Sequence, residues 1–325
     1  MIELAVVDDS SVAQARRAAQ ARGVAVAFDE VRVGQLAIVA TELATNIVKH
    51  GGGGTLLVGD GEAHVDLLAL DRGPGMADVA KCLADGYSSA GTLGNGLGAV
   101  RRLSQAFAVA SWPGLGTGIL ARVVRQGAAP PTDSVGGLSV PKRGEDVCGD
   151  GWWTQARGSD CSVLVVDGLG HGPEAARAAH EALRVFQRNP AAPPAESVQS
   201  LHLALRHTRG GALAVASIDA AAGTVTYAGL GNIAASLVPV NGPPRHLVSL
   251  NGIAGHNARK IHAFEYPCGQ GLLIMHSDGI GTGWKPERYP GFTHLHPLLL
   301  SGLLFRDFAR GRDDATVVVV KLGPA

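Results

Sequence analysis

The sequence predicts an α/β protein built of two sandwich domains joined by a short linker, and three observations lead to this prediction. The first is length, because 325 residues exceed the roughly 100–200 residues of a single domain. The second is residues 126–137, QGAAPPTDSVGG, where two prolines stand among small or polar residues without an apolar period. The third is the change from mixed helices and strands before this stretch to short apolar strands after it. We expect domains at 1–125 and 138–325, with 126–137 as the linker.

Composition excludes several classes of protein. Lys plus Arg and Asp plus Glu are 28 each, so the chain lacks the basic footprint of a general nucleic-acid binder. No apolar run approaches the 18 residues of a membrane helix, and the first residues lack a secretory pattern. The 4 cysteines form no C-x-x-C pair, which is typical of reduced thiols in a cytosol. We expect a cytoplasmic protein that binds neither nucleic acid nor membrane.

The first domain is predicted to alternate helices with strands. Asp9 is expected to cap its first helix and Gly23 to end it. A hairpin is expected to turn at Asp60–Gly61. The expected helices cover about 9–22, 30–50 and 97–106, and the expected strands cover 2–7, 56–58, 64–70, 107–111 and 117–125.

The second domain is predicted to be a frame of strands with helices packed outside it. Pro193 and Pro194 separate its two expected helices, at about 173–187 and 195–207. The expected strands cover 161–166, 213–218, 224–228, 233–238, 272–276 and 316–320.

A group of polar residues in the second expected helix points to a ligand site. Glu42, Asn46 and Lys49 are spaced i, i+4 and i+7, which places them on one helix face. A carboxylate, an amide and an ammonium together can position a divalent metal and a polyphosphate. The alternative, which these three residues alone leave open, is a solvated helix face.

Three glycine-rich segments follow in the same domain. They are Asp71-Arg-Gly-Pro-Gly-Met76, Gly91-Thr-Leu-Gly-Asn-Gly-Leu-Gly98 and Gly114-Leu-Gly-Thr-Gly118. Glycine amides that precede a helix can bind phosphate through their N–H groups and the helix dipole. One such loop is usually only a turn, but the ordered set with the polar helix face indicates a nucleotide site.

This order resembles the N, G1, G2 and G3 boxes of the GHKL (Bergerat) ATP-binding fold, and within it the bacterial RsbT-like anti-sigma and switch serine kinases. The resemblance covers roughly residues 1–125. It implies ATP and Mg²⁺ as cofactors, with Asp71 bonded to the adenine amino group, Asn46 holding Mg²⁺ and Glu42 acting as general base. It also implies that the nucleotide-binding residues include Lys49, Gly73, Gly75, Gly94, Gly96, Gly98 and Thr117. The chain has no separate phosphoacceptor helix, so the expected acceptor is a serine or threonine of a partner.

Four short acidic motifs mark the second domain. They are Gly144-Glu-Asp-Val-Cys-Gly-Asp150, Val165-Val-Asp-Gly-Leu-Gly-His-Gly172, His276-Ser-Asp-Gly279 and Gly311-Arg-Asp-Asp-Ala-Thr316. Carboxylates at strand ends can converge at one end of a sheet, and such oxygen ligands suit Mg²⁺ or Mn²⁺. Any single Asp-Gly pair is usually a turn. Their recurrence beside expected strands favours a two-metal centre.

These motifs resemble the SpoIIE-type branch of the type 2C metal-dependent phosphatases, with a length similar to its RsbX-like members. The resemblance implies that a metal-activated hydroxide attacks phosphoserine or phosphothreonine. Asp150, Asp167, Asp278 and Asp313 would be metal ligands, together with the Gly168 carbonyl, and Asp167 would bridge two Mn²⁺ or Mg²⁺ ions. Asp167 and Asp278 are the expected catalytic residues. Asp314 remains an alternative to Asp313, and the roles of His171, Glu145 and Asp146 stay open.

The sequence therefore predicts a bifunctional bacterial switch enzyme. Its first domain is expected to phosphorylate a serine or threonine, and its second to remove such a phosphate. Both resembled families act on small STAS-type antagonist domains in stress-response signalling, so the resemblance implies such a domain as the partner. A sigma-factor regulatory protein is the second candidate partner. The alternative is that the first domain is an ATP-binding module that sequesters a partner and regulates an active phosphatase.

Overall fold

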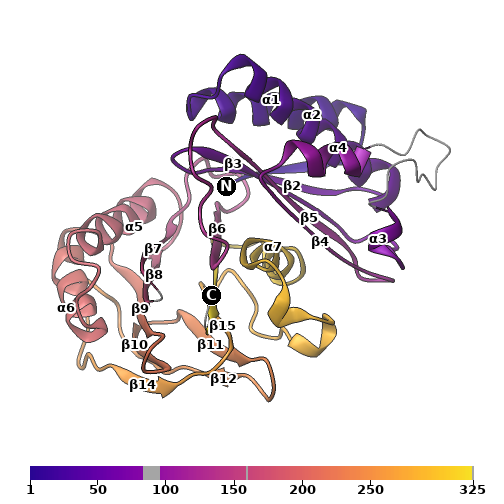
Figure 1. The fold of residues 1–325 in the computed structure, drawn as a ribbon. Coiled ribbons are helices and arrows are strands. Elements are labelled where there is room, and N and C mark those ends of the chain that lie inside the picture. The colour runs from indigo at the N-terminus through magenta and orange to yellow at the C-terminus, as the bar shows by residue number, and fades with distance from the viewer. Residues whose placement is uncertain (83–95, 159, 324–325) are drawn as a thin grey trace. The chain divides into compact units, whose positions relative to one another are not determined.

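The computed structural model describes residues 1–82, 96–158 and 160–323, and the chain divides into two compact units, Met1–Thr132 and Asp133–Ala325 (Figure 1). The division lies inside the stretch expected to be the linker. The far end of that stretch is not linker, however, because β6 (Val135–Val140) pairs antiparallel with β16 (Ala315–Leu322). Residues 135–137 thus belong to the second unit, and the predicted start at 138 is too late.

The first unit contains a five-stranded antiparallel sheet in the order β1-β2-β3-β5-β4. Its strands are β1 (Ile2–Val6), β2 (Gly54–Asp60), β3 (His64–Asp71), β4 (Ala106–Trp112) and β5 (Gly116–Val124). Its helical segments are α1 (Asp9–Ala25), α2 (Glu30–Asn46), the π turn η1 (Ile47–Gly51), α3 (Val79–Cys82) and α4 (Gly96–Leu103).

The ends of α1 differ from the prediction. Asp8, not Asp9, caps the helix: its carboxylate accepts a hydrogen bond from the Ser11 backbone N–H at 2.8 Å, and Ser11 Oγ accepts one from the Asp8 N–H at 3.0 Å. This reciprocal pair is a capping box. Gly23 does not end the helix, which continues to Ala25. A Cβ atom at Gly23 would lie 3.0 Å from Leu36 Cδ2. The glycine therefore serves close packing between α1 and α2.

The core of the first unit lies between one face of the sheet and the helices α1, α2 and α4, which Figure 1 shows on the same side of that sheet. Leu36, Val39 and Leu43 of α2 are completely buried there. The helical stretch Glu30–Gly51 is, by length and composition alone, long and apolar enough to cross a membrane. Because these apolar side chains contact the sheet and α1, the stretch is a core helix of this unit.

The second unit contains two sheets. One has six strands, in the order β13-β10-β9-β8-β7 with β14 also on β10, and the other has five, in the order β12-β11-β15-β16-β6. The strands not yet given are β7 (Asp150–Arg157), β8 (Asp160–Gly168), β9 (Gly211–Asp219), β10 (Thr224–Leu230), β11 (Ala234–Pro239), β12 (Arg245–His246), β13 (Ser249–Leu250), β14 (Phe264–Pro267) and β15 (Gly271–His276). The helices are α5 (Pro173–Phe186), α6 (Pro194–Ala204) and α7 (Pro297–Phe308), with short 3₁₀ turns η2 (Leu205–His207), η3 (Pro286–Arg288) and η4 (Phe292–His294).

These elements form an α-β-β-α sandwich, which confirms the predicted fold class. Val165 of β8 and Met275 of β15 belong to one core between the two sheets. Helices α5 and α6 cover the outer face of the first sheet, and α7 packs on β6 and β16 of the second. Helix α7 was not predicted, because residues from Pro297 to Phe305 are all buried and the segment has no polar face to give it a helical period.

Candidate functional site

Two candidate sites lie in the two units, and the first is centred on the end of α2. Glu42 and Asn46 are half-buried on its last turns. A Cβ atom on Gly96, the first residue of α4, would lie 2.6 Å from Glu42 Oε2, so glycine permits this close approach. Asn46 Nδ2 is buried and has no hydrogen-bond partner among the described residues. A buried N–H donor of this kind requires an acceptor, which an oxygen of a bound nucleotide would provide.

Lys49 lies in the π turn η1, and its side chain is exposed. A π turn has an i→i+5 hydrogen-bond pattern, so the i+7 spacing from Glu42 no longer follows a regular α-helical face. Lys49 is therefore at the edge of the candidate site rather than in line with Glu42 and Asn46.

Asp71, the last residue of β3, joins two glycine-rich segments. Its Oδ1 atom accepts hydrogen bonds from the backbone N–H of Gly73 at 2.8 Å and of Thr117 at 3.2 Å. Gly75 has a φ of +73°, and a Cβ atom there would lie 2.1 Å from the Trp112 carbonyl oxygen, so only glycine fits. These contacts place Asp71, Gly73, Gly75 and Thr117 together.

The third glycine-rich segment is described only in part. Gly96 and Gly98 are in α4, where Gly98 is buried. Gly94 lies outside the described residues, as do all the residues of this segment before Gly96.

The second candidate site collects four aspartates at strand ends. Asp150 is the first residue of β7 and stands opposite Asp167 of β8 in the antiparallel register. Asp278 follows β15, and Asp313 precedes β16. Asp167, Asp278 and Asp313 line one pocket of about 500 Å³, while Asp150 is buried beside it. The tertiary structure thus brings together residues that are far apart in sequence.

The electrostatics of this pocket favour a bound cation. Burial raises the pKa of Asp167 to about 9, with added repulsion from Asp150 and Asp278. Burial also raises the pKa of Asp150 to about 7, against the opposing hydrogen bond from Ser277. For Asp278, burial and the Asp313 charge raise the pKa more than Arg310 lowers it. Clustered carboxylates with raised pKa values are stabilised in their ionised form by a divalent ion.

The donor set also fits the chemistry of magnesium and manganese. In the described part of the chain, no group of three or more His, Cys, Asp or Glu side chains could hold a metal ion. Mg²⁺ usually keeps several waters and takes only one or two carboxylates from the protein. The aspartates of the pocket fit this coordination preference. Gly168 is buried, and its N–H donates a hydrogen bond to the Gly149 carbonyl oxygen at 3.0 Å. Gly168 is not among the residues that line the pocket.

The structure separates Asp313 from Asp314. Asp314 is buried, and its two carboxylate oxygens accept hydrogen bonds from the backbone N–H groups of Lys142 at 2.8 Å and Gly149 at 2.9 Å. It therefore holds the loop that leads into Asp150. Asp313 lines the pocket instead.

The residues with open roles lie outside this pocket. His171 Nδ1 and Glu145 Oε1 are 2.6 Å apart and form a partly exposed pair. Asp146 is exposed. Neither His171, Glu145 nor Asp146 is among the residues that line the pocket.

Two functional neighbours were not singled out from the sequence. Ser277 Oγ donates to Asp150 Oδ2 at 2.5 Å and accepts from the Thr316 N–H at 3.0 Å. Asn232 Nδ2 donates to Asp278 Oδ2 at 2.7 Å. Ser277 and Thr316 belong to acidic motifs that were recognised, so their place in those motifs could have indicated them. Asn232 follows β10 in a turn that carries no comparable signal.

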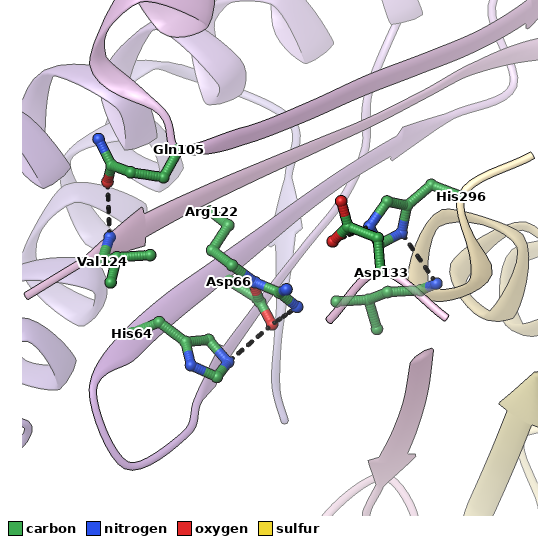
Figure 2. Close-up of polar contacts among 8 residues, drawn as sticks. His64, Asp66, Gln105, Arg122, Val124, Asp133 and His296 are labelled. Atoms are coloured by element: carbon green, nitrogen blue, oxygen red, sulfur yellow. Dashed lines mark hydrogen bonds and ion pairs between the residues drawn. The ribbon is translucent and has the colours of Figure 1, made fainter. Parts of the chain in front are cut away.

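A buried charge cluster on the first unit's sheet belongs to neither site (Figure 2). Arg122 donates to both oxygens of Asp66, at 2.6 and 3.0 Å, and His64 Nε2 lies 3.4 Å from Asp66. Burial alone would raise the pKa of Asp66, but hydrogen bonds from His64 and Arg122 outweigh it and lower the pKa. Figure 2 also shows Asp133 and His296, which form a separate pair at 3.0 Å within the second unit.

The first unit is similar to known ATP-binding kinases. Residues 6–122 match the family model of the histidine kinase-like ATPase domain. The serine/threonine-protein kinase RsbT of Bacillus subtilis (strain 168) is 36% identical over 98 residues, which is 29% of this chain and 74% of that protein.

Solved structures match the larger part of the chain. A chain from work on the bacterial stressosome, described as a modular system adapted to control secondary messenger signaling, is 30% identical with a TM-score of 0.54, covering 57% of this chain and 97% of that one. RsbX in complex with magnesium is 19% identical with a TM-score of 0.52, covering 60% of this chain and 99% of that one, and it shows the fold of the second unit. Together with the geometry of the two sites, these similarities establish that the chain belongs to the RsbT-like branch of the GHKL ATPase family, here fused to a unit with the type 2C phosphatase fold.

Proposed function

We propose that the chain is a bifunctional cytoplasmic switch enzyme, an ATP-dependent serine/threonine protein kinase and a metal-dependent phosphoserine and phosphothreonine phosphatase. One observation carries this proposal: a single chain holds Glu42, Asn46 and Asp71 around one candidate site and a pocket of aspartates in its other unit. The two sites would catalyse opposite reactions, because one would transfer phosphate from ATP to a side chain and the other would remove phosphate from such a side chain.

In the kinase unit, each residue has a distinct task. Asp71 would accept a hydrogen bond from the adenine amino group, because hydrogen bonds from two backbone N–H groups to its Oδ1 atom already fix the position of its carboxylate. Asn46 would hold Mg²⁺, which neutralises the phosphates of the nucleotide. Glu42 would take the proton of the acceptor hydroxyl, a general-base role that typically contributes about 10²–10⁴-fold in rate.

In the phosphatase unit, Asp150, Asp167, Asp278 and Asp313 would hold two Mn²⁺ or Mg²⁺ ions, with the Gly168 carbonyl as a further ligand. Such ions lower the pKa of water and offset the charge of a phosphate.

The protein's other residues orient those ligands. Ser277 fixes one oxygen of Asp150, and Asn232 fixes one oxygen of Asp278. Asp314 keeps the loop before Asp150 in place through two backbone hydrogen bonds. The remaining space of the pocket would admit the phosphorylated side chain.

The partner that we propose is a STAS-type antagonist domain of a stress-response pathway. The similarity to RsbT and to a stressosome chain supports a place in partner-switching regulation. The second partner that we propose is a sigma-factor regulatory protein of the same pathway. Kinase and phosphatase in one polypeptide would set the phosphorylation level of one regulatory protein.

The test is incubation of the purified chain with labelled ATP and candidate STAS domains. Wild type in EDTA-free buffer should turn phosphate over, Asp278→Asn should accumulate phosphorylated partner, and Glu42→Gln should leave it bare. If Asp278→Asn binds ATP and captures the partner without labelling it, the first unit is a sequestering module and not a kinase. If pre-phosphorylated partner keeps its label with Mn²⁺ and wild-type protein, the phosphatase half of the proposal fails.

A further inference from the structure

A second pocket of the phosphatase unit lies along helix α5 and has no part in the chemistry described above. Its volume is about 510 Å³, similar to that of the aspartate pocket. One face of α5 forms a wall, through Pro173, Ala176, Arg177, His180 and Arg184. Positions 176 and 177 follow 173 by three and four residues, and 180 and 184 continue in such steps, which places these side chains along a single helix face. His207 of η2 stands on another wall. We refer to this pocket as the α5 groove.

The α5 groove has a floor of small side chains and a basic rim. Ala176 is buried, whereas Arg177, His180, Arg184 and His207 are exposed. Small floor residues leave room for the stem of an incoming side chain, and an arginine rim provides donors for its carboxylate. The groove therefore suits a chain segment with acidic side chains.

One acidic residue, Glu181, also lines the groove, but it is already paired. Both of its carboxylate oxygens accept hydrogen bonds from Arg184, with Nε at 2.8 Å and Nη2 at 2.5 Å. Arg177 makes no ion pair within the described part of the chain. The hydrogen bond from Arg184 lowers the pKa of Glu181 most, burial opposes it, and the charge of Arg177 lowers it by a smaller amount. The formal charge of the two arginines and Glu181 is +1, so the rim keeps a net attraction for anions.

The α5 groove and the aspartate pocket adjoin along the chain, because one short segment runs from the lining of one pocket into the lining of the other, and a second segment leads from the groove to Asp150. Val147 lines the groove three residues before the metal-ligand candidate Asp150. Pro173 lines it three residues after Gly170, which lines the aspartate pocket. A polypeptide with its phosphorylated residue in one pocket would have its flanking residues near the other.

We propose that the α5 groove binds an acidic segment flanking the phosphorylated serine or threonine of the protein substrate. This inference rests on the proposed phosphatase activity and adds a selectivity that the aspartate pocket lacks, since no Lys, Arg or His is among the described residues lining that pocket. The arginines would act on substrate affinity and not on the chemical step, because they lie outside the aspartate pocket.

The test measures hydrolysis of three substrates by the full chain with Mn²⁺. Two are synthetic phosphoserine peptides of equal length, one with glutamates on both sides of the phosphoserine and one with glutamines. The third is p-nitrophenyl phosphate, which has no flanking residues. The variants are Arg177→Glu/Arg184→Glu and the milder Arg177→Gln/His207→Gln, which leaves the Glu181–Arg184 pair intact. Arg157→Glu/Lys321→Glu is the matched control, because both residues are exposed and line neither pocket.

Wild type should prefer the glutamate peptide over the glutamine peptide by about tenfold in kcat/KM, as expected for rim charges at low salt. This preference should fall as salt screens the charges. Arg177→Glu/Arg184→Glu should lose the preference through KM and hydrolyse p-nitrophenyl phosphate at the wild-type rate, and the milder variant should lose part of it. The control should resemble wild type.

A charge-reversed variant that keeps the wild-type preference would overturn the inference, and so would a wild type without any preference between the peptides. If wild type hydrolyses none of the three substrates, the proposed phosphatase function itself fails. That result is distinct, because it appears before any variant is compared.

Discussion

Replacing Asp167 by Asn should stabilise the metal-free protein near and above neutral pH, although it removes a proposed catalytic residue. Burial, with repulsion from neighbouring aspartates, raises the pKa of this carboxyl from 3.8 to about 9 in the folded chain. Between these two pH values the folded protein holds a proton that the unfolded chain has released. The stability from this proton is fully present below about pH 4 and is lost as pH rises towards 9. Asparagine cannot ionise, so the variant avoids that loss.

The size of the effect follows from the two pKa values. At pH 7.5 the unfolded carboxyl lies about 3.7 pH units above its pKa, and at about 1.36 kcal/mol per unit this gives an upper limit of about 5 kcal/mol. The pocket is open to water, which screens the charge, so we expect about half of that limit. For a domain of roughly 150–250 residues, 2–3 kcal/mol corresponds to a rise in Tm of about 5–10 °C.

Calorimetry of the full chain in EDTA at pH 5 and pH 8 would test this prediction. The advantage of Asp167→Asn over wild type should be larger at pH 8, and Mn²⁺ should remove it by stabilising the ionised carboxylates of the wild type. Glu265→Gln, which removes an exposed charge of the same unit, is the control and should show no such pH dependence. Equal Tm differences at the two pH values would refute the assignment of Asp167 to a repulsive carboxylate cluster.

Three further predictions concern the two sites. Asp71→Asn should weaken calorimetric ATP affinity by about 1–3 kcal/mol, because it loses an acceptor for a buried amino group; unchanged affinity would contradict the adenine role. Glu42→Gln should bind ATP normally and transfer phosphate about 10²–10⁴-fold more slowly, and a wild-type transfer rate would place the base elsewhere. Asp314→Ala should lower the Tm, because the N–H groups of two loop residues lose their acceptor and each one that stays buried costs about 1–3 kcal/mol. Asp313→Ala should keep the Tm and lose phosphatase activity. The reverse pattern would exchange the roles of the two aspartates.

The sequence predicted best those elements whose pattern is local. The hairpin of β2 and β3 turns where Asp60–Gly61 indicated, and α2 begins at Glu30 as its apolar period predicted. The prediction failed where the deciding contact is distant. Helix α7 has no polar face, and the strand that begins at Val135 exists because it pairs with the end of the chain.

The same distinction applies to the candidate sites. Short motifs predicted Asp150, Asp167 and Asp278, because each of these residues stands next to a glycine or an expected strand in the sequence. Adjacent Asp313 and Asp314 could not be separated, because only the fold decides which carboxylate meets the backbone of a loop about 165 residues away in sequence. Asn232 likewise becomes visible only through its hydrogen bond to Asp278.

The pairing of β6 with β16 has a consequence for the order in which the protein matures on the ribosome. The first strand of the second unit must wait for its partner until residues 315–322 have been synthesised. At about 5–20 residues per second, the intervening stretch takes roughly 10–35 s to translate. The nucleotide-binding unit, whose sheet is complete with Val124, can fold during that interval. If the proposed function holds, each new molecule acquires its kinase unit before its phosphatase unit, and a newly made chain first favours phosphorylation of its partner.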